Sequence, residues 1–207
     1  MLKNVYYINL DHREDRKESV ERQLNDLGWN YTRFPAIKHT HGAIGCTMSH
    51  ISLLKMAQEK DLDYITIIED DIVFTKPNVF KENLNKFLDS GIKYDVLFLG
   101  GNSYKPHKKI NEFCIQTFNC QTTVGYIAKK HFYQKLIDNF SESKELLIKH
   151  PKKPHLYCLD MYWKSLQRAH KFYFIIPPTV TQLKSYSDID KRKWNADGLM
   201  LNINKRK

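Results

Sequence analysis

Short apolar runs alternate with segments of helical periodicity through the first half of this chain. The runs lie at 5–10, 31–36, 64–68 and 95–99, and each is four to eight residues long, as expected of a strand. Strands made of nearly continuous apolar residues are typical of parallel sheets that are covered by helices on both faces. The chain is therefore predicted to adopt an α/β fold.

Three helices are predicted between these strands, because apolar residues recur there every three or four positions. The apolar faces are Val20, Leu24 and Leu27, then Ile51, Leu54 and Ala57, then Phe80, Leu84 and Phe87. Gly28 is expected to end the first helix, and Thr47 to cap the second.

The second half of the chain has a less regular pattern. We expect paired strands at 113–118 and 122–128, helices at 131–139 and 156–166, and a last strand at 172–176 that Pro177 stops. We assign residues 1–184 to one domain. Residues 185–207 form a polar, basic tail with few apolar anchors, which we expect to order over bound ligand as a lid.

The composition of the 207-residue chain restricts its location and its partners. No apolar run reaches the roughly 20 residues of a membrane span, and no signal peptide opens the sequence, so a cytoplasmic protein with reduced cysteines is expected. Its net charge of +10 is spread over several segments. This pattern predicts no nucleic-acid partner and leaves attraction to an anionic membrane surface open.

Polar residues that directly follow apolar strands are the first candidates for function, because ligands of open α/β sheets bind outside the carboxyl ends of the strands. Four junctions have this character. They are Asn9-Leu10-Asp11 with Arg13 and Arg16, Glu69-Asp70-Asp71, Gly100-Gly101-Asn102, and the segment 122–126.

The acidic triplet Glu69-Asp70-Asp71 is the strongest of these signals. Three adjacent carboxylates repel one another, and burial at a sheet edge requires a cation or arginines to compensate them. Carboxylate oxygens favour Mg²⁺ or Mn²⁺, which bridge such groups to a diphosphate. An acid-rich surface turn is the alternative.

The remaining candidates are weaker when each is taken alone. Arg13 and Arg16 open a helix, where they can receive phosphates or simply form local charge pairs. The segment 42–50 enters a helix through glycines but lacks the lysine of a P-loop. Asp160 borders an apolar helix face, where partial burial would raise its pKa toward that of a general base, although a surface aspartate fits equally well.

Taken together, these residues resemble glycosyltransferase family 25, which contains lipooligosaccharide and collagen hydroxylysine galactosyltransferases. The resemblance extends over about 3–190. It is carried by Tyr7-Ile8-Asn9-Leu10-Asp11 with Arg13, Asp15 and Arg16, by Gly45-Cys46 with Ser49-His50, by Ile68-Glu69-Asp70-Asp71, by 95–100, by Gly125-Tyr126-Ile127, and by Gln182 with Ser185-Tyr186-Ser187-Asp188-Ile189.

The resemblance implies a single GT-A (Rossmann-like) domain with a mostly parallel sheet, and an inverting transfer of a hexose from a UDP-sugar to a glycan, lipooligosaccharide or hydroxylysine-type acceptor. It implies Mn²⁺ or Mg²⁺ on Glu69 and Asp71, and Asp160 as the base. Asp95, which begins the strand leading to Gly100, is our second choice for the base. The residues implied to bind the donor are Asn9, Leu10, Asp11, Arg13, Arg16, Ser49, His50, Asp70, Gln182 and Ser185.

The sequence departs from the family in one respect that concerns the metal. Many GT-A enzymes carry a further histidine ligand near the last strand, where this chain has Gln182, Ser185 and Ser187. Two alternatives to a transferase stay open. One is a metal-dependent phosphoryl hydrolase, and the other is a non-catalytic basic binding protein on the same fold.

Overall fold

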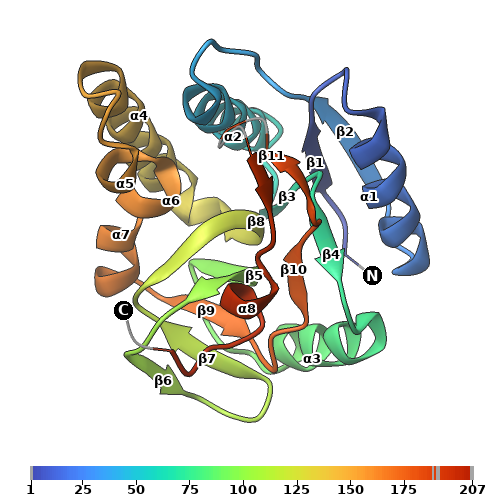
Figure 1. Ribbon diagram of the computed structural model, residues 1–207. Helices are drawn as coiled ribbons and strands as arrows, with labels where there is room; N and C mark the ends of the chain where they lie inside the picture. The colour runs from blue at the N-terminus through green and yellow to red at the C-terminus, as the bar shows by residue number, and fades with distance from the viewer. Residues whose placement is uncertain (1, 188, 190–191, 206–207) are drawn as a thin grey trace.

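The computed structural model describes residues 2–187, 189 and 192–205. A central sheet runs across the molecule in the strand order β2-β1-β3-β8-β5-β9-β7-β6 (Figure 1). Its strands are β1 (Val5–Asn9), β2 (Tyr31–Pro35), β3 (Tyr64–Glu69), β5 (Val96–Ser103), β6 (His107–Lys109), β7 (Cys114–Thr117), β8 (Cys120–Lys129) and β9 (Phe172–Ile175).

Most strands of this sheet run in one direction. β1 pairs in parallel with β2 and β3, and β5 pairs in parallel with β9. β8 is antiparallel to both β3 and β5, so these two share a direction. β7 is antiparallel to β9 and β6. The prediction of an α/β fold with a mostly parallel sheet is confirmed.

Helices cover both faces of the sheet, as continuous apolar strands require. The helices are α1 (Glu14–Asp26), α2 (Gly42–Glu59), α3 (Pro77–Asp89), α4 (Tyr133–Lys149), α5 (Pro154–Tyr157), α6 (Leu159–Tyr162), α7 (Lys164–Ala169) and α8 (Asp197–Met200), with a 3₁₀ turn η1 at Lys130–Phe132. α1, α3 and α8 contribute to one apolar core, and α2, α4 and α6 to another.

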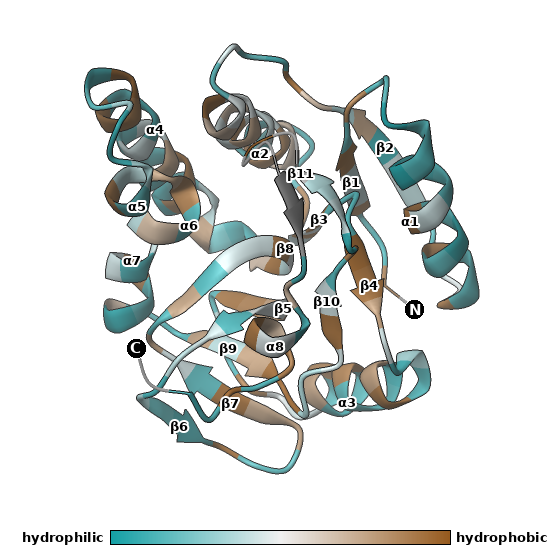
Figure 2. Ribbon diagram, in the orientation of Figure 1, coloured by the Kyte–Doolittle hydropathy of each residue, from teal (hydrophilic) through white to brown (hydrophobic). Residues whose placement is uncertain are grey.

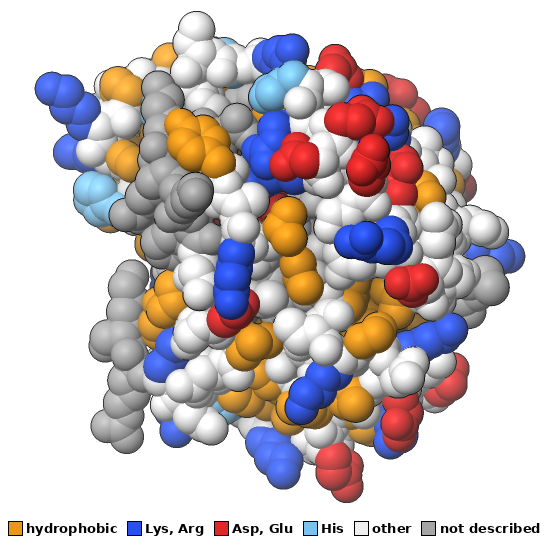
Figure 3. All heavy atoms as spheres, turned by 45° about the vertical axis from the view of Figure 1, so that its right-hand side comes forward, with side chains coloured by type: hydrophobic (Ala, Val, Ile, Leu, Met, Phe, Trp, Pro, Cys, Tyr) orange, Lys and Arg blue, Asp and Glu red, His pale blue; other side chains and the backbone are white. Residues whose placement is uncertain are grey.

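The two cores divide the side chains of each strand by alternation. In β5, Val96 and Phe98 belong to the core under α2 and α4, whereas Leu97 and Leu99 belong to the core under α1 and α3. In Figure 2, hydrophobic residues lie along β1 and β4 (Ile72–Phe74), and hydrophilic residues cover much of α1. On the face drawn in Figure 3, basic side chains are scattered among acidic ones.

Two predictions about local structure were wrong. Thr47 does not cap α2, which begins at Gly42 after His41, and the Thr47 hydroxyl instead donates to the Ala43 carbonyl at 2.8 Å within the helix. The segment Gly100-Gly101-Asn102 does not follow a strand that ends at residue 99, as was predicted. It lies inside β5, which is buried along its whole length, because β8 pairs beside it as far as Ser103.

Two predictions about the second half also need correction. The strands expected at 113–118 and 122–128 exist as β7 and β8 but do not pair with each other, because ten-residue β8 inserts between β3 and β5 while β7 pairs with β9. The helix expected at 156–166 is divided into α5, α6 and α7. Extended backbone at Cys158 (φ −61°, ψ 148°) separates the first two.

The C-terminal segment is attached to the domain at several points. β10 (Val180–Gln182) pairs with β4, and β11 (Ser185–Ser187) pairs with β12 (Arg192–Trp194). Ala196 and Met200 lie in the core under α1 and α3, so the predicted tail has apolar anchors that its composition did not suggest. The division at residue 184 stays a prediction. Among the described residues, no helix combines the length and apolar character needed to cross a membrane.

The close packing of β5 against β10 predicts that Gly100→Ala destabilises the fold. A Cβ at Gly100 would lie 2.7 Å from Val180 Cβ and 3.3 Å from Val124 Cγ1, and branched valines cannot rotate away. We expect a loss of about 1–3 kcal/mol in the free energy of unfolding, measured with denaturant. Gly198→Ala is the matched control, because among the described residues nothing beyond its chain neighbours and its own helix backbone lies within 4 Å of the added Cβ. If Gly100→Ala were as stable as Gly198→Ala, the close packing of Gly100 against Val180 and Val124 would be contradicted.

Candidate active site

The acidic triplet lies where β3 ends, beside the end of β1. Glu69 is the last residue of β3 and pairs with Ile8, and Asp70 and Asp71 form the turn to β4. The side chains of Asp70 and Asp71 are only 9% and 14% exposed, which excludes the alternative of an acid-rich surface turn. β10 pairs with β4 and so brings the C-terminal segment to the same edge.

Asp70 is held by two side chains from the first β-α unit. Arg16 Nη1 donates to its Oδ1 at 2.9 Å, and Asn9 Nδ2 donates to its Oδ2 at 2.8 Å. Arg16 Nη1 also lies 3.3 Å from Asp71 Oδ2. Burial raises the pKa of Asp70 despite the Arg16 charge and these hydrogen bonds. Both oxygens of Asp70 are therefore engaged within the protein.

Asp71 has weaker partners. Gln182 Nε2 lies 3.4 Å from each of its carboxylate oxygens, and the Leu183 amide donates to its backbone carbonyl at 2.6 Å. Burial and the negative charges of Glu69 and Asp70 raise the pKa of Asp71 to about 7, although Arg16 opposes the shift. One guanidinium thus faces three carboxyl groups, and Asp71 is the least compensated of them.

Glu69 turns toward α2 and β8. Its Oε1 accepts a hydrogen bond from the Thr123 hydroxyl and lies 3.5 Å from His50 Nε2. Burial opposes ionisation, yet the His50 and Thr123 contacts outweigh it and lower the pKa of Glu69. Tyr126 OH lies 3.0 Å from His50 Nδ1 and fixes the ring from its other side.

Asp160 approaches the triplet from α6. Its Oδ2 accepts a hydrogen bond from the Thr122 amide at 3.0 Å, in the strand that also carries Thr123. Burial raises the pKa of Asp160, and the nearby charge of Glu69 adds to this shift. Thr122 has a φ of +67°, a strained value for a β-branched residue. Adjacent residues of β8 thus contact two carboxylates, Thr122 that of Asp160 and Thr123 that of Glu69.

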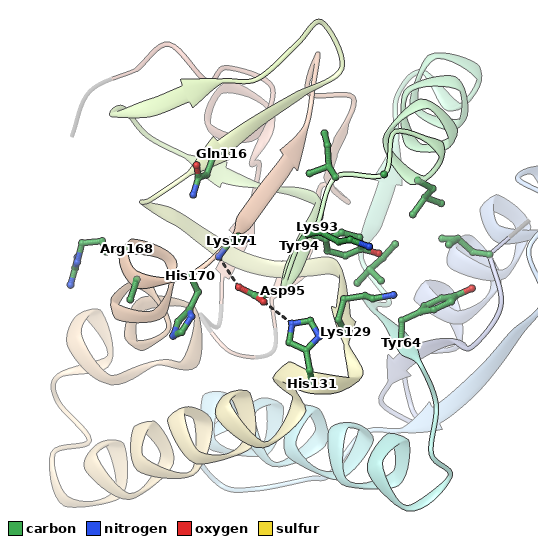
Figure 4. Close-up of a pocket in the computed structure, with 16 residues that line it drawn as sticks. Tyr64, Lys93, Tyr94, Asp95, Gln116, Lys129, His131, Arg168, His170 and Lys171 are labelled. Carbon is green, nitrogen blue, oxygen red and sulfur yellow. Dashed lines mark hydrogen bonds and ion pairs between the residues drawn. The ribbon is translucent and has the colours of Figure 1, made fainter.

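Asp95, the second choice for the base, lies at the opposite edge of the sheet, just before β5 begins. Figure 4 shows it between His131, whose Nε2 is 2.7 Å away, and the Lys171 amide, which donates to it at 2.8 Å. These residues line a cavity of about 890 Å³ with lysines and tyrosines around it, away from the acidic triplet. Asp95 cannot serve as a base at the triplet from this position.

The two arginines after β1 have different surroundings. Arg16 reaches the triplet and also donates to Ser185 Oγ and the Tyr186 carbonyl, each at 3.0 Å. Arg13 forms a two-pronged pair with Asp15 at 2.9 Å, lowering the pKa of Asp15 to about 2, and reaches the Tyr186 carbonyl at 3.2 Å. The local charge pair with Asp15 therefore explains some of the contacts of Arg13. Arg16, by contrast, contacts the acidic triplet itself.

Three further donor-site candidates have internal or peripheral positions. The buried Ser49 hydroxyl accepts from the Ile37 amide and donates to the Gly45 carbonyl, both at 2.9 Å. Asp11 is exposed and pairs with Arg33 at 2.6 Å. The Leu10 carbonyl accepts the Arg13 amide at 2.9 Å. Donor contacts for these residues stay predictions.

The structure therefore brings together most residues that the sequence selected. These are Asn9, Arg13, Arg16, His50, Glu69, Asp70, Asp71, Asp160, Gln182 and Ser185. The sequence pointed to Thr123 and Tyr126 only as members of the segment 122–126. Their contacts with Glu69 and His50 depend on the pairing of β8 with β3. The lid role of residues around Ser185 stays a prediction, which hydrogen exchange with and without UDP would decide.

A family model described as glycosyltransferase family 25 (LPS biosynthesis protein) matches residues 38–145. A Drosophila melanogaster protein named glycosyltransferase 25 family member is 27% identical, over 50% of this chain and 22% of that protein. Procollagen galactosyltransferase 1-B of Xenopus laevis is 26% identical, over 65% of this chain and 28% of that protein. The chain spans less than a third of the length of these relatives.

Among solved structures, a glycosyltransferase involved in the glycosylation of the major capsid of PBCV-1 aligns over 74% of this chain and 73% of that chain. Its sequence identity is 12% and its TM-score is 0.41, which is too low to define a shared fold. Assignment to a family rests instead on the family model, which matches more than half of the sequence. The chain belongs to glycosyltransferase family 25.

Proposed function

We propose that this chain transfers a hexose from a UDP-sugar to an acceptor hydroxyl, with a divalent cation held by Glu69 and Asp71. The observation that carries the proposal is the acidic cluster at the ends of β1 and β3, where three carboxyl groups lie largely out of solvent and a single arginine contacts two of them. Family membership supports a sugar transfer at this site.

The residues present fit a hard divalent cation. Asp70 is engaged by Arg16 and Asn9 at 2.8–2.9 Å, whereas the contacts of Asp71 are longer, to Arg16 at 3.3 Å and to Gln182 at 3.4 Å. Glu69 lies two residues before Asp71, at the end of β3. Such carboxylate oxygens suit Mn²⁺ or Mg²⁺. When bound, the cation would neutralise charge on the diphosphate leaving group.

Side chains around the cluster supply the remaining functions. Arg16 and Arg13 lie at the start of α1, where positive charge can orient the donor's nucleotide. Asp160 is our proposed base, because burial raises its pKa and it lies near Glu69. The acceptor hydroxyl would lose its proton to Asp160 as its oxygen bonds to the anomeric carbon, and the diphosphate would leave from the opposite face. This single displacement inverts the configuration.

The names of the relatives suggest the sugar and the acceptor. Two relatives are procollagen galactosyltransferases, from Xenopus laevis and Mus musculus, and the family model carries the description LPS biosynthesis protein. We therefore propose galactose as the first sugar to test. Hydroxylysine-type peptides and lipooligosaccharide glycans are the acceptors to test.

Asp71→Asn tests the metal assignment. We expect the variant to lose at least about tenfold in Mn²⁺-dependent affinity for UDP, because an amide cannot replace a charged ligand between the cation and the cluster. Isothermal calorimetry with Mn²⁺ and with a chelator measures this. The exposed Asp89→Asn, at the end of α3, is the matched control. If UDP bound wild type equally well with chelator, the triplet would not be a metal site.

Without metal, Asp71→Asn should be more stable than wild type. That result would show that the variant loses UDP affinity without unfolding. The folded-state pKa of Asp71 is about 7, above its ordinary value of 3.8. Wild type therefore loses stability as pH rises between these values, and the loss persists above them. We expect Asp71→Asn to gain on the order of 1–3 kcal/mol at about pH 8, and less near pH 4.

Asp160→Asn tests the base. The amide keeps the size of the side chain and can still accept the Thr122 amide, but it cannot take a proton. We expect transfer to fall about 10²- to 10⁴-fold while UDP affinity changes by less than about threefold. Product formation with a UDP-sugar panel measures the rate, and Asp95→Asn, at the opposite sheet edge, should retain it. Near wild-type transfer by Asp160→Asn would assign the base elsewhere.

A further inference from the structure

Cys46, His50 and Glu69 form a compact group of mixed ligand atoms beside the acidic cluster. Cys46 and His50 lie one turn apart on α2 and so share a face, and Glu69 approaches them from the end of β3. The sulfur, a ring nitrogen and a carboxylate oxygen all lie within 4.8 Å of one another. The three side chains come from two elements that the core holds against each other.

The imidazole of His50 is fully buried and rigidly held. Its ring stacks on Tyr126 with centroids 5.7 Å apart and meets the edge of Phe140, and Nδ1 lies 3.0 Å from Tyr126 OH. Nε2 has no hydrogen-bond partner among the described residues and faces Glu69 Oε1 at 3.5 Å. A buried nitrogen without a hydrogen bond costs free energy unless another group, such as a cation, engages it.

The contact on Nδ1 matches what histidine ligands of metals usually show. Such a histidine commonly bonds through one nitrogen to the metal while its other nitrogen is held by a neighbouring polar group. Tyr126 provides that neighbour, and its own burial keeps the ring from turning. Nε2 is therefore aimed at the space between Cys46 and Glu69.

We propose that Cys46, His50 and Glu69 form a binding site for a thiophilic divalent cation of the Zn²⁺ class, distinct from the oxygen-ligand cation of the donor site. Tetrahedral zinc with bonds of about 2.0–2.3 Å places its ligand atoms roughly 3.3–3.7 Å apart, so small side-chain rotations close the observed separations. Thiolate and imidazole select Zn²⁺ over Mg²⁺ or Mn²⁺.

The two ligand sets share Glu69. A zinc ion bound through Glu69 withdraws that carboxylate from the donor cation at Asp71, so Zn²⁺ should antagonise Mn²⁺-dependent UDP binding. This consequence rests on the proposed function, whereas the zinc site itself does not.

Co²⁺ tests the site directly, because a cobalt–thiolate bond gives a charge-transfer band in the near ultraviolet. We expect one equivalent of Co²⁺ to produce this band in metal-free wild type, and one equivalent of Zn²⁺ to remove it. Cys46→Ser should lose the band, and His50→Gln should bind Co²⁺ at least about tenfold more weakly. Thermal unfolding of each metal-free variant confirms that it is folded.

Asp71→Asn separates this proposal from the proposed function. It should keep the cobalt band, since Asp71 is not a ligand of this site, while losing Mn²⁺-dependent UDP affinity. Zn²⁺ should weaken UDP binding in wild type but not in Cys46→Ser. The proposal is overturned if folded wild type gives no thiolate band, or if the band persists in Cys46→Ser and disappears in Cys158→Ser.

Discussion

The contact of Arg16 with Asp70 and Asp71 is the interaction on which the site depends. Its guanidinium, carried by α1, joins the turn after β3 to the C-terminal segment through Ser185 and the Tyr186 carbonyl. It offsets only part of the negative charge that burial concentrates there, and the raised pKa of Asp71 reflects the remainder. A buried cluster of this kind costs free energy in the isolated protein and becomes favourable when a cation binds.

The sheet topology explains how distant residues reach this cluster. β1 and β3 are adjacent and parallel, so Asn9 and Glu69 end at the same edge. β4 and β10 then turn back from that edge together, which places Gln182 over Asp71. β8 completes the site from the other side through Thr122 and Thr123. The groups around the triplet are thus positioned by strand ends, by the short turn between β3 and β4, and by the helices α1, α2 and α6.

Local patterns were enough to predict the first half of the fold and the acidic cluster. Apolar runs and helical spacing located β1, β2 and β3, and the rule that ligands bind at carboxyl ends of strands selected Asn9, Arg16 and the triplet. Asp160 was a weak candidate from its position beside an apolar helix face, and Gln182 and Ser185 were reached only through the family resemblance. Strand pairing is a non-local property, so the insertion of β8 between β3 and β5, and the burial of Gly100 inside β5, were not foreseen.

The position of a bound metal tests the central claim most directly. An anomalous-difference map from crystals grown with Mn²⁺ and UDP would locate the cation without assumptions about activity. Our account predicts a peak within coordination distance of the Asp71 carboxylate and of the UDP diphosphate. A manganese peak held by the diphosphate and solvent alone, or one remote from the acidic triplet, would contradict it.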